Sequence, residues 1–265
     1  MLRKLMKYEL KATARYFLPI YLAILTLSLI IGLRGVNETF LPFLNFLLPT
    51  ILGLSFMGLM VMTVILIVTR FDKNLLGDEG YLMFTLPTKV TTLIHAKLLS
   101  SMLWILLSGL IFLLSILFIT FRHISFLDLR ILWDTLPKDY MFLLLLVLLT
   151  VVGILQSLLQ VYASLSIAQS YSITKNRVLG GILVFIVISM AFNIFESVVS
   201  LGGTFFFRES PWLQMVMDET MFQNIEDIFQ FFKSFMTVYL VYTSVKAVLF
   251  YFFTKYHLEK KLNLD

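Results

Sequence analysis

The sequence predicts an all-α membrane protein with six transmembrane helices. Hydrophobic residues make up 59% of its 265 residues and charged residues only 14%, and the apolar residues fall into long uncharged runs. A water-soluble fold of this composition would expose large apolar patches, whereas a bilayer solvates them. The chain has no cysteine, which excludes disulfides and cysteine-ligated metal sites.

Six stretches are long enough to cross a hydrocarbon core, which takes about 20 apolar residues in a helix. The second is expected to begin near Pro49 and to leave 34–47 as a loop, and Gly202 and Gly203 are expected to break the fifth. The chain is treated as one transmembrane domain, 1–265, with spans at about 17–34, 48–69, 98–121, 141–166, 178–201 and 234–254.

The distribution of Lys and Arg predicts the orientation of these spans. An even number of spans places both termini on one side of the membrane. If that side is the cytoplasm, the inner segments hold about 14 Lys and Arg and the outer segments about six, the bias typical of inner loops. We therefore expect both termini in the cytoplasm, and the net charge of +5 reflects membrane topology and not nucleic-acid binding.

Two further helical elements are expected outside the spans. Residues 2–16 have an apolar face and a basic remainder, which predicts an amphipathic helix on the anionic inner leaflet; a simple basic flank of the first span is the alternative. Apolar residues at helical spacing within 201–233 predict a short amphipathic or re-entrant helix before the sixth span, with a plain surface loop as the alternative. The apolar face of the first element consists of Leu2, Leu5, Met6, Leu10 and Ala14.

Motifs for chemistry within the chain are missing from the sequence. There is no phosphate-binding Gly-x-x-x-x-Gly-Lys-Ser/Thr loop, no His-Glu-x-x-His motif and no Gly-x-Ser-x-Gly nucleophile elbow. We therefore expect no enzyme activity, no metal and no cofactor in this chain.

Several polar residues fall inside the predicted spans, where such residues often mark a pathway or a partner. Glu196, with Asn193 before it, is either a gate or substrate contact or a carboxylate that reaches headgroup water. Gln156 and Gln160 lie one helical turn apart, which favours helix packing or a lined cavity. Lys246 is expected to extend its long side chain to the interface.

A polar island, Arg70–Lys97, separates the second and third spans. Its apolar side chains are too many for a free loop and its charged ones too many for lipid. A short amphipathic element that docks into the groove of a soluble partner satisfies both demands, and an ordinary interfacial loop is the alternative. The apolar members are Tyr81, Met83, Phe84 and Leu86, and the charged ones are Asp72, Lys73, Asp78, Glu79 and Lys89.

The order of motifs in this island resembles that of ABC-2-type transporter permeases, and the runs 1–11 and 80–87 look especially like those of permeases of Gram-positive bacteria. Glu79-Gly80 is similar to the acidic–Gly element of that family, Leu86-Pro87-Thr88 to its Pro element, and Lys97 to the Lys that opens span three. Tyr81 stands where many members have Thr. The basic N-terminal helix, the six spans and the hydrophobic element between spans five and six extend the resemblance over nearly the whole chain.

The resemblance implies a permease subunit in a bacterial plasma membrane, with ATP and Mg²⁺ bound by a separate ATPase. Two ATPase subunits would bind two permease subunits, identical or related, and drive export of an amphipathic peptide, drug or lipid-like compound. It also implies a coupling helix that contacts the ATPase through Asp78, Glu79, Gly80, Tyr81, Phe84 and Pro87.

Two other classes of function remain open at this point. One is an ATP-independent immunity or scaffold protein whose island binds a different partner. The other is a secondary transporter, although the spans contain neither a central carboxylate nor an evident inverted repeat.

Overall fold

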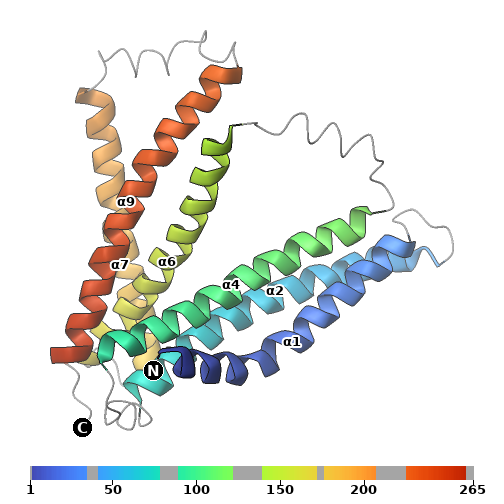
Figure 1. Ribbon diagram of the computed structural model, residues 1–265, viewed down its shortest axis with the longest axis horizontal. Coiled ribbons are helices and arrows are strands. Elements are labelled where there is room, and N and C mark those ends of the chain that lie inside the picture. Colours follow the sequence, from blue (N-terminus) through green and yellow to red (C-terminus); the bar gives the residue numbers. More distant parts are fainter. Residues whose placement is uncertain are drawn as a thin grey trace. The chain divides into compact units, whose positions relative to one another are not determined.

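The computed structural model describes residues 2–34, 41–77, 89–121, 139–171, 176–206 and 225–260. Over these ranges the chain is helical and contains no strand (Figure 1). The elements are α1 (Leu2–Arg34), α2 (Phe43–Phe71), the π-helix η1 (Asp72–Leu76), α4 (Val90–Thr120), α6 (Tyr140–Ser170), α7 (Arg177–Phe206) and α9 (Ile225–Lys260). With α2 and η1 taken together, the described ranges hold six helices long and apolar enough to cross a membrane. This confirms the predicted all-α class and the multi-pass character.

Two predicted helix ends are wrong. α2 begins at Phe43 and contains Pro49. A proline near the start of a helix removes only one backbone hydrogen bond, here the bond to the carbonyl of Asn45, so the helix continues through it. α7 continues through Gly202 and Gly203 to Phe206. Glycine in a helix costs only about 1 kcal/mol relative to alanine, whereas backbone groups left unbonded in lipid cost several kcal/mol each.

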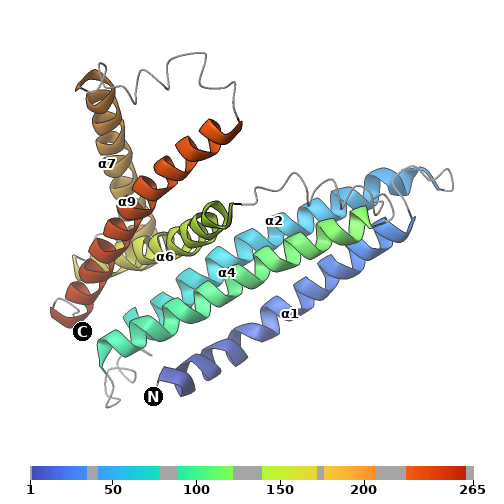
Figure 2. The ribbon, with the colours of Figure 1, turned by 45° about the horizontal axis from the view of Figure 1, so that its top comes forward.

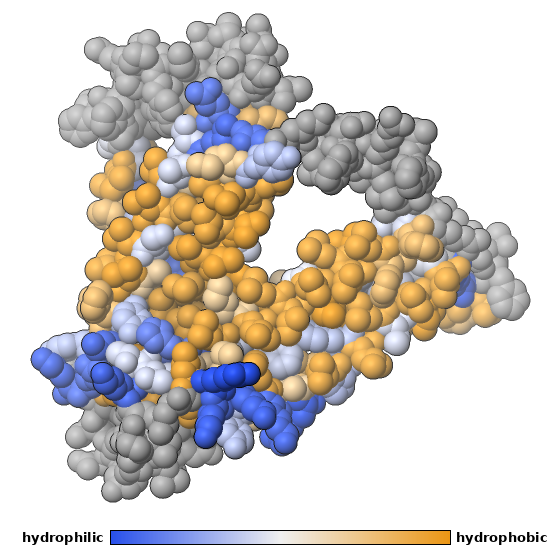
Figure 3. All heavy atoms as spheres, viewed as in Figure 1, coloured by the Kyte–Doolittle hydropathy of each residue, from blue (hydrophilic) through white to orange (hydrophobic). Residues whose placement is uncertain are grey.

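The basic N-terminal segment forms the first turns of α1 and is continuous with the first span. The apolar face predicted for residues 2–16 is half-buried, while Arg3, Lys4, Lys7 and Lys11 are exposed. Figure 3 shows hydrophilic residues gathered over this part of α1, whereas the flanks of the long helices are hydrophobic. The sequence pattern of this segment is therefore confirmed, but it is not a separate helix.

The element expected before the sixth span is likewise part of a longer helix. Residues 225–232 form the first turns of α9, which runs on without interruption to Lys260. The remainder of that predicted element, up to 224, lies outside the described residues.

The chain divides into two compact units, residues 1–137 and 138–263. In the first unit α1, α2 and α4 run side by side (Figure 2), and α1 packs most extensively on α4. In the second unit α6 packs against both α9 and α7. Each unit therefore supplies three of the six spans.

A buried stripe along α1 forms the core of the first unit. Its members recur every three or four residues, so they share one face of the helix. The Phe17 ring stacks on Trp104 of α4 with centroids 4.5 Å apart, and the Tyr21 hydroxyl donates to the Trp104 carbonyl at 3.1 Å. The stripe consists of Glu9, Thr13, Phe17, Tyr21, Ile24, Ser28, Ile31 and Gly32.

Asp139 joins two helices at one end of the second unit. Its carboxylate accepts a hydrogen bond from the Met141 amide at 3.0 Å, which caps the start of α6, and it pairs with Lys233 of α9. The hydrogen bond from Lys233 holds the pKa of the Asp139 carboxyl below its usual value. Nearby, the rings of Phe142 and Phe229 meet edge to face at 5.3 Å. This end of the α6–α9 pair is thus fixed by charge and by ring packing.

Gly32 lies at a close contact between α1 and α4. A Cβ at this position would lie 1.9 Å from the carbonyl oxygen of Phe118. Because that atom belongs to the backbone, no side-chain rotation can relieve the overlap. Small residues at contacts of this kind allow membrane helices to approach closely.

We predict that Gly32→Ala destabilises the protein by roughly 1–3 kcal/mol, the usual cost of overpacking a tight contact. Gly109→Ala is the matched control, since no described atom lies within 4 Å of a Cβ there. Thermal unfolding of the two variants in the same detergent measures the difference. Equal melting temperatures would show that the helices separate at Gly32 without cost.

Candidate functional site

The six residues predicted to contact an ATPase all belong to the segment 78–88. Asp78, Glu79, Gly80, Tyr81, Phe84 and Pro87 therefore lie outside the described residues. The structure does describe the chain on both sides of this segment, where η1 ends at Leu76 and α4 begins at Val90. The candidate site is consequently defined by what holds these two flanks.

A buried ion pair holds the α4 flank to α1. The Nζ of Lys97 lies 2.5 Å from Oε1 of Glu9, and only 5% and 10% of the two side chains are exposed. With its amide oriented to satisfy both neighbouring groups, Asn74 on η1 accepts from the Lys97 ammonium at 3.3 Å and donates to the Arg70 carbonyl at 3.2 Å. Lys97 therefore contacts both α1 and the end of the second span.

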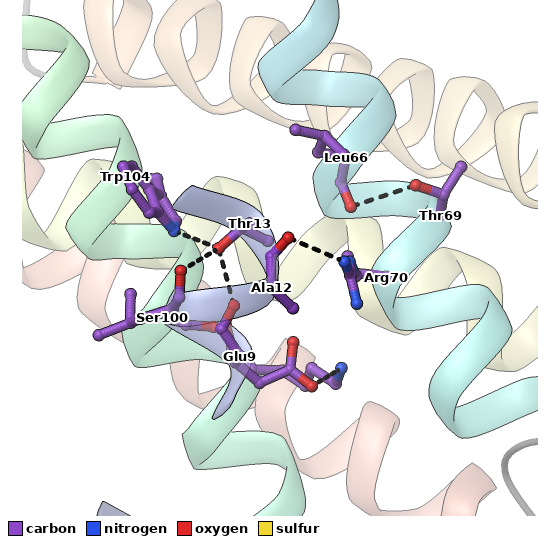
Figure 4. A network of polar contacts seen from close by, with 10 residues as sticks. Glu9, Ala12, Thr13, Leu66, Thr69, Arg70, Ser100 and Trp104 are labelled. Carbon is purple, nitrogen blue, oxygen red and sulfur yellow. Dashed lines mark hydrogen bonds and ion pairs between the residues drawn. The ribbon is translucent and has the colours of Figure 1, made fainter. Parts of the chain in front are cut away.

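A second set of contacts ties α1 to α2 and α4 one turn further along (Figure 4). The Arg70 guanidinium donates to the Ala12 carbonyl at 3.3 Å. The Trp104 indole donates to the Thr13 hydroxyl at 2.7 Å, and that hydroxyl donates in turn to the Glu9 carbonyl at 2.8 Å. We call Glu9, Arg70, Asn74 and Lys97 the polar frame.

The π-helix η1 anchors the other flank of the segment. Leu75 and Leu76 are fully buried, and the Gly77 amide closes the element on the Asp72 carbonyl at 2.8 Å. Short π-helical turns are rare and often occur at functional sites. The chain therefore leaves α2 from a packed position immediately before residue 78.

Glu9 and Asn74 are the members of the polar frame that the sequence did not indicate. The signal for Glu9 was its position as an acidic side chain in a segment rich in Lys and Arg. Buried carboxylates of this kind need a cationic partner. Sequence alone does not reveal that the partner is Lys97, 88 positions away.

Gln156 and Gln160 form a polar contact between α6 and α7 in the second unit. The Gln156 amide donates to Gln160 Oε1 at 3.0 Å, and the Gln160 amide donates to the Ser189 hydroxyl at 2.8 Å. Asn193 donates to the carbonyl of Ser189 within its own helix at 2.8 Å. Two of the predicted pathway residues are thus brought together, and Asn193 bonds to neither of them.

Glu196 forms a separate cluster with two residues of α9. Its Oε1 accepts from the Lys246 ammonium at 2.9 Å and from the Tyr242 hydroxyl at 2.7 Å. The ammonium also lies 4.7 Å from the centroid of the Phe192 ring, a favourable cation–π distance. The prediction that Lys246 extends to the interface is therefore wrong, because the Glu196 carboxylate and the rings of Phe192 and Tyr242 surround its ammonium group.

Comparisons with protein-family models, with curated proteins and with solved structures each find no match. Within the described ranges, no group of three His, Asp or Glu side chains is placed to hold a metal ion. The polar frame of the first unit and the polar contacts of the second unit are therefore interpreted from their own geometry and chemistry.

We predict that Glu9→Gln lowers the free energy of unfolding by roughly 3 kcal/mol, because it leaves Lys97 charged and buried without its carboxylate. The double variant Glu9→Gln/Lys97→Met is expected to recover most of this loss, since it removes both charges. Thermal unfolding in detergent tests both. A double variant less stable than either single one would contradict a simple ion-pair role.

Lys246→Met is expected to lower the free energy of unfolding by on the order of 1 kcal/mol, which is less than the expected loss for Lys97→Met. The reason is that 41% of the Glu196 side chain is exposed, whereas Glu9 is almost enclosed, and that the Tyr242 hydroxyl still donates to the Glu196 carboxylate when Lys246 is removed. The same thermal assay ranks Lys246→Met against Lys97→Met. The opposite ranking would mean that Glu196 is more deeply enclosed in the folded protein than the second unit indicates by itself.

Proposed function

We propose that the chain is the transmembrane permease subunit of an ABC exporter of the ABC-2 type, with ATP hydrolysed by a separate subunit. The observation that carries this proposal is the polar frame, which fixes both flanks of the segment 78–88 to α1. The resemblance of that segment to the coupling element of such permeases supplies the function of the contact.

A coupling segment has to transmit motion from a soluble partner to the spans. The frame suits this task, because Arg70 and Asn74 on one flank and Lys97 on the other are bonded within the first unit. A push on the segment would therefore move α1, α2 and α4 together, where a loosely tethered loop would absorb it.

The residues of the segment divide into three roles under this proposal. Asp78 and Glu79 pair with basic residues of the ATPase, and Tyr81 and Phe84 fill an apolar groove in it. Gly80 and Pro87 would contribute the backbone conformations that the docked element needs. Aromatic anchors with a charged rim are the usual composition of a strong protein contact.

Under this proposal the frame and both termini lie in the cytoplasm, which the Lys and Arg bias supports. The exposed basic face of the first turns of α1 would then rest on the anionic inner leaflet of a bacterial plasma membrane. ATP-driven closure of two ATPase subunits would rock two permease subunits, this chain and an identical or related one.

The polar clusters of the second unit are the proposed contacts of the export pathway. Gln156, Gln160 and Glu196 offer hydrogen-bonding groups inside spans that are otherwise apolar, and Asn193 lies between Ser189 and Glu196 on α7. An amphipathic peptide, drug or lipid-like compound carries both the polar and the apolar groups that such a surface accepts.

Co-purification with an ABC ATPase, sought among the products of the neighbouring genes, tests the proposal. We predict that Glu79→Ala/Tyr81→Ala weakens the complex roughly tenfold or more, as removal of central anchors does, and abolishes any stimulation of ATP turnover. The control is Glu209→Ala/Tyr140→Ala, which changes the same residue types on the predicted outer side.

Two outcomes would contradict the proposal. Unchanged assembly and unchanged ATP turnover in the Glu79/Tyr81 variant would remove the coupling role of the segment. Failure of any ATPase to bind the unaltered chain would favour an ATP-independent immunity or scaffold protein.

A further inference from the structure

A cationic cavity of about 280 Å³ lies between α1 and α2 in the first unit. Three of its lining residues are cations, and none is acidic. We call it the cationic cavity, and the lining residues that matter here are Arg15, Tyr16, Leu66, Thr69, Arg70 and Lys73.

The three cations retain hydrogen-bonding capacity toward a ligand. A guanidinium has five N–H donors. Arg15 uses one of them on the Tyr16 hydroxyl at 2.9 Å, and Arg70 uses one on the Ala12 carbonyl. Lys73 is exposed at the edge of the cavity. The nearby carboxylate of Glu9 is paired with Lys97, and that of Asp72 is buried outside the lining. The cavity thus has a net positive charge that an anion can neutralise.

The cavity lies where the spans meet the water. The long uncharged run of α1 begins at Tyr16, and that of α2 ends at Val68 and Thr69, just before Arg70. Tyrosine is enriched at this level of membrane proteins. Leu66 adds an apolar wall on the side of the span, so the cavity is polar at one end and apolar at the other.

Thr69 offers an acceptor to a ligand that carries a hydroxyl group. Its own hydroxyl donates to the Ile65 carbonyl at 2.7 Å, so the hydroxyl proton is engaged. The oxygen can still accept a hydrogen bond. A glycerol headgroup supplies such a donor next to a phosphate.

We propose that the cationic cavity binds the phosphodiester of an anionic phospholipid with a glycerol headgroup. Arg15, Arg70 and Lys73 would bond the phosphate oxygens, since bonds between charged groups are the strong ones. Thr69 would accept from the glycerol, and the acyl chains would follow Leu66 into the bilayer. Basic pockets between spans on the cytoplasmic side suit such headgroups. This inference requires only a membrane protein and is independent of the transporter proposal.

The test uses the full chain, purified in a neutral detergent, with three probes. Phosphatidylglycerol, phosphatidylcholine with the same acyl chains, and inorganic phosphate are each titrated, and binding is followed by native mass spectrometry and by thermal stabilisation. We expect phosphatidylglycerol alone to bind with one-to-one stoichiometry and to raise the melting temperature.

The variant Arg15→Gln/Lys73→Gln is expected to weaken phosphatidylglycerol binding roughly tenfold or more, because it removes two charge-assisted contacts. Both side chains are exposed, so the fold should survive. The single variant Lys73→Glu provides a second measurement and is expected to weaken binding in the same direction. The control Lys4→Gln/Lys11→Gln removes the same charge from α1 outside the cavity and is expected to change binding less than twofold, roughly the effect of screened surface charges.

Three results would overturn the proposal. Equal losses in the cavity variant and the control would show general attraction to a basic surface. Equal binding of phosphatidylglycerol and phosphatidylcholine would exclude recognition of the anionic headgroup. Binding of inorganic phosphate as tightly as phosphatidylglycerol, with competition between them, would assign the cavity to a free phosphate.

Discussion

Glu9 and Lys97 meet at 2.5 Å although 88 positions separate them in the chain. Removing two charges from water costs several kcal/mol for each ion, and close approach with further hydrogen bonds recovers that cost. Thr13, Trp104 and the stacked Phe17 ring lie on the same faces of α1 and α4. The first unit therefore depends on a register that places the carboxylate opposite the ammonium.

The second unit also contains a carboxylate that has to lie opposite an ammonium group on another helix, but this pair is less enclosed. Glu196 satisfies Lys246 and Tyr242 across two helices that each pack on α6, yet much of its side chain stays exposed. α7 diverges from α9 toward Phe206 (Figure 2). The contacts between these two helices include the Glu196 cluster and the edge-to-face pair of Phe192 and Phe250 at 5.4 Å. A carboxylate with one protected and one open side would suit an exchange of partners in the proposed transport cycle.

The proposals for the first unit use different faces of one structure. The polar frame joins α1, η1 and α4 around the segment 78–88, and the cationic cavity lies on the α1–α2 side, with Arg70 common to both. A lipid held there would add a contact between α1 and α2 where the bond from Arg70 to Ala12 already exists. Anionic lipid would thereby stiffen the unit that the coupling segment is proposed to move.

The sequence by itself determined the helical class, the six spans and the basic face of residues 2–16, because hydropathy and charge are properties of each residue in turn. It misplaced the start of α2 at Pro49 and the end of α7 at Gly202, because the bilayer favours bonded backbone more strongly than propensity disfavours these residues. It identified Gln156, Gln160 and Glu196 as polar groups in spans but assigned Lys246 to the interface. Only the tertiary structure decided which charges meet, since Glu9–Lys97 and Glu196–Lys246 depend on distances between helices that no local pattern encodes.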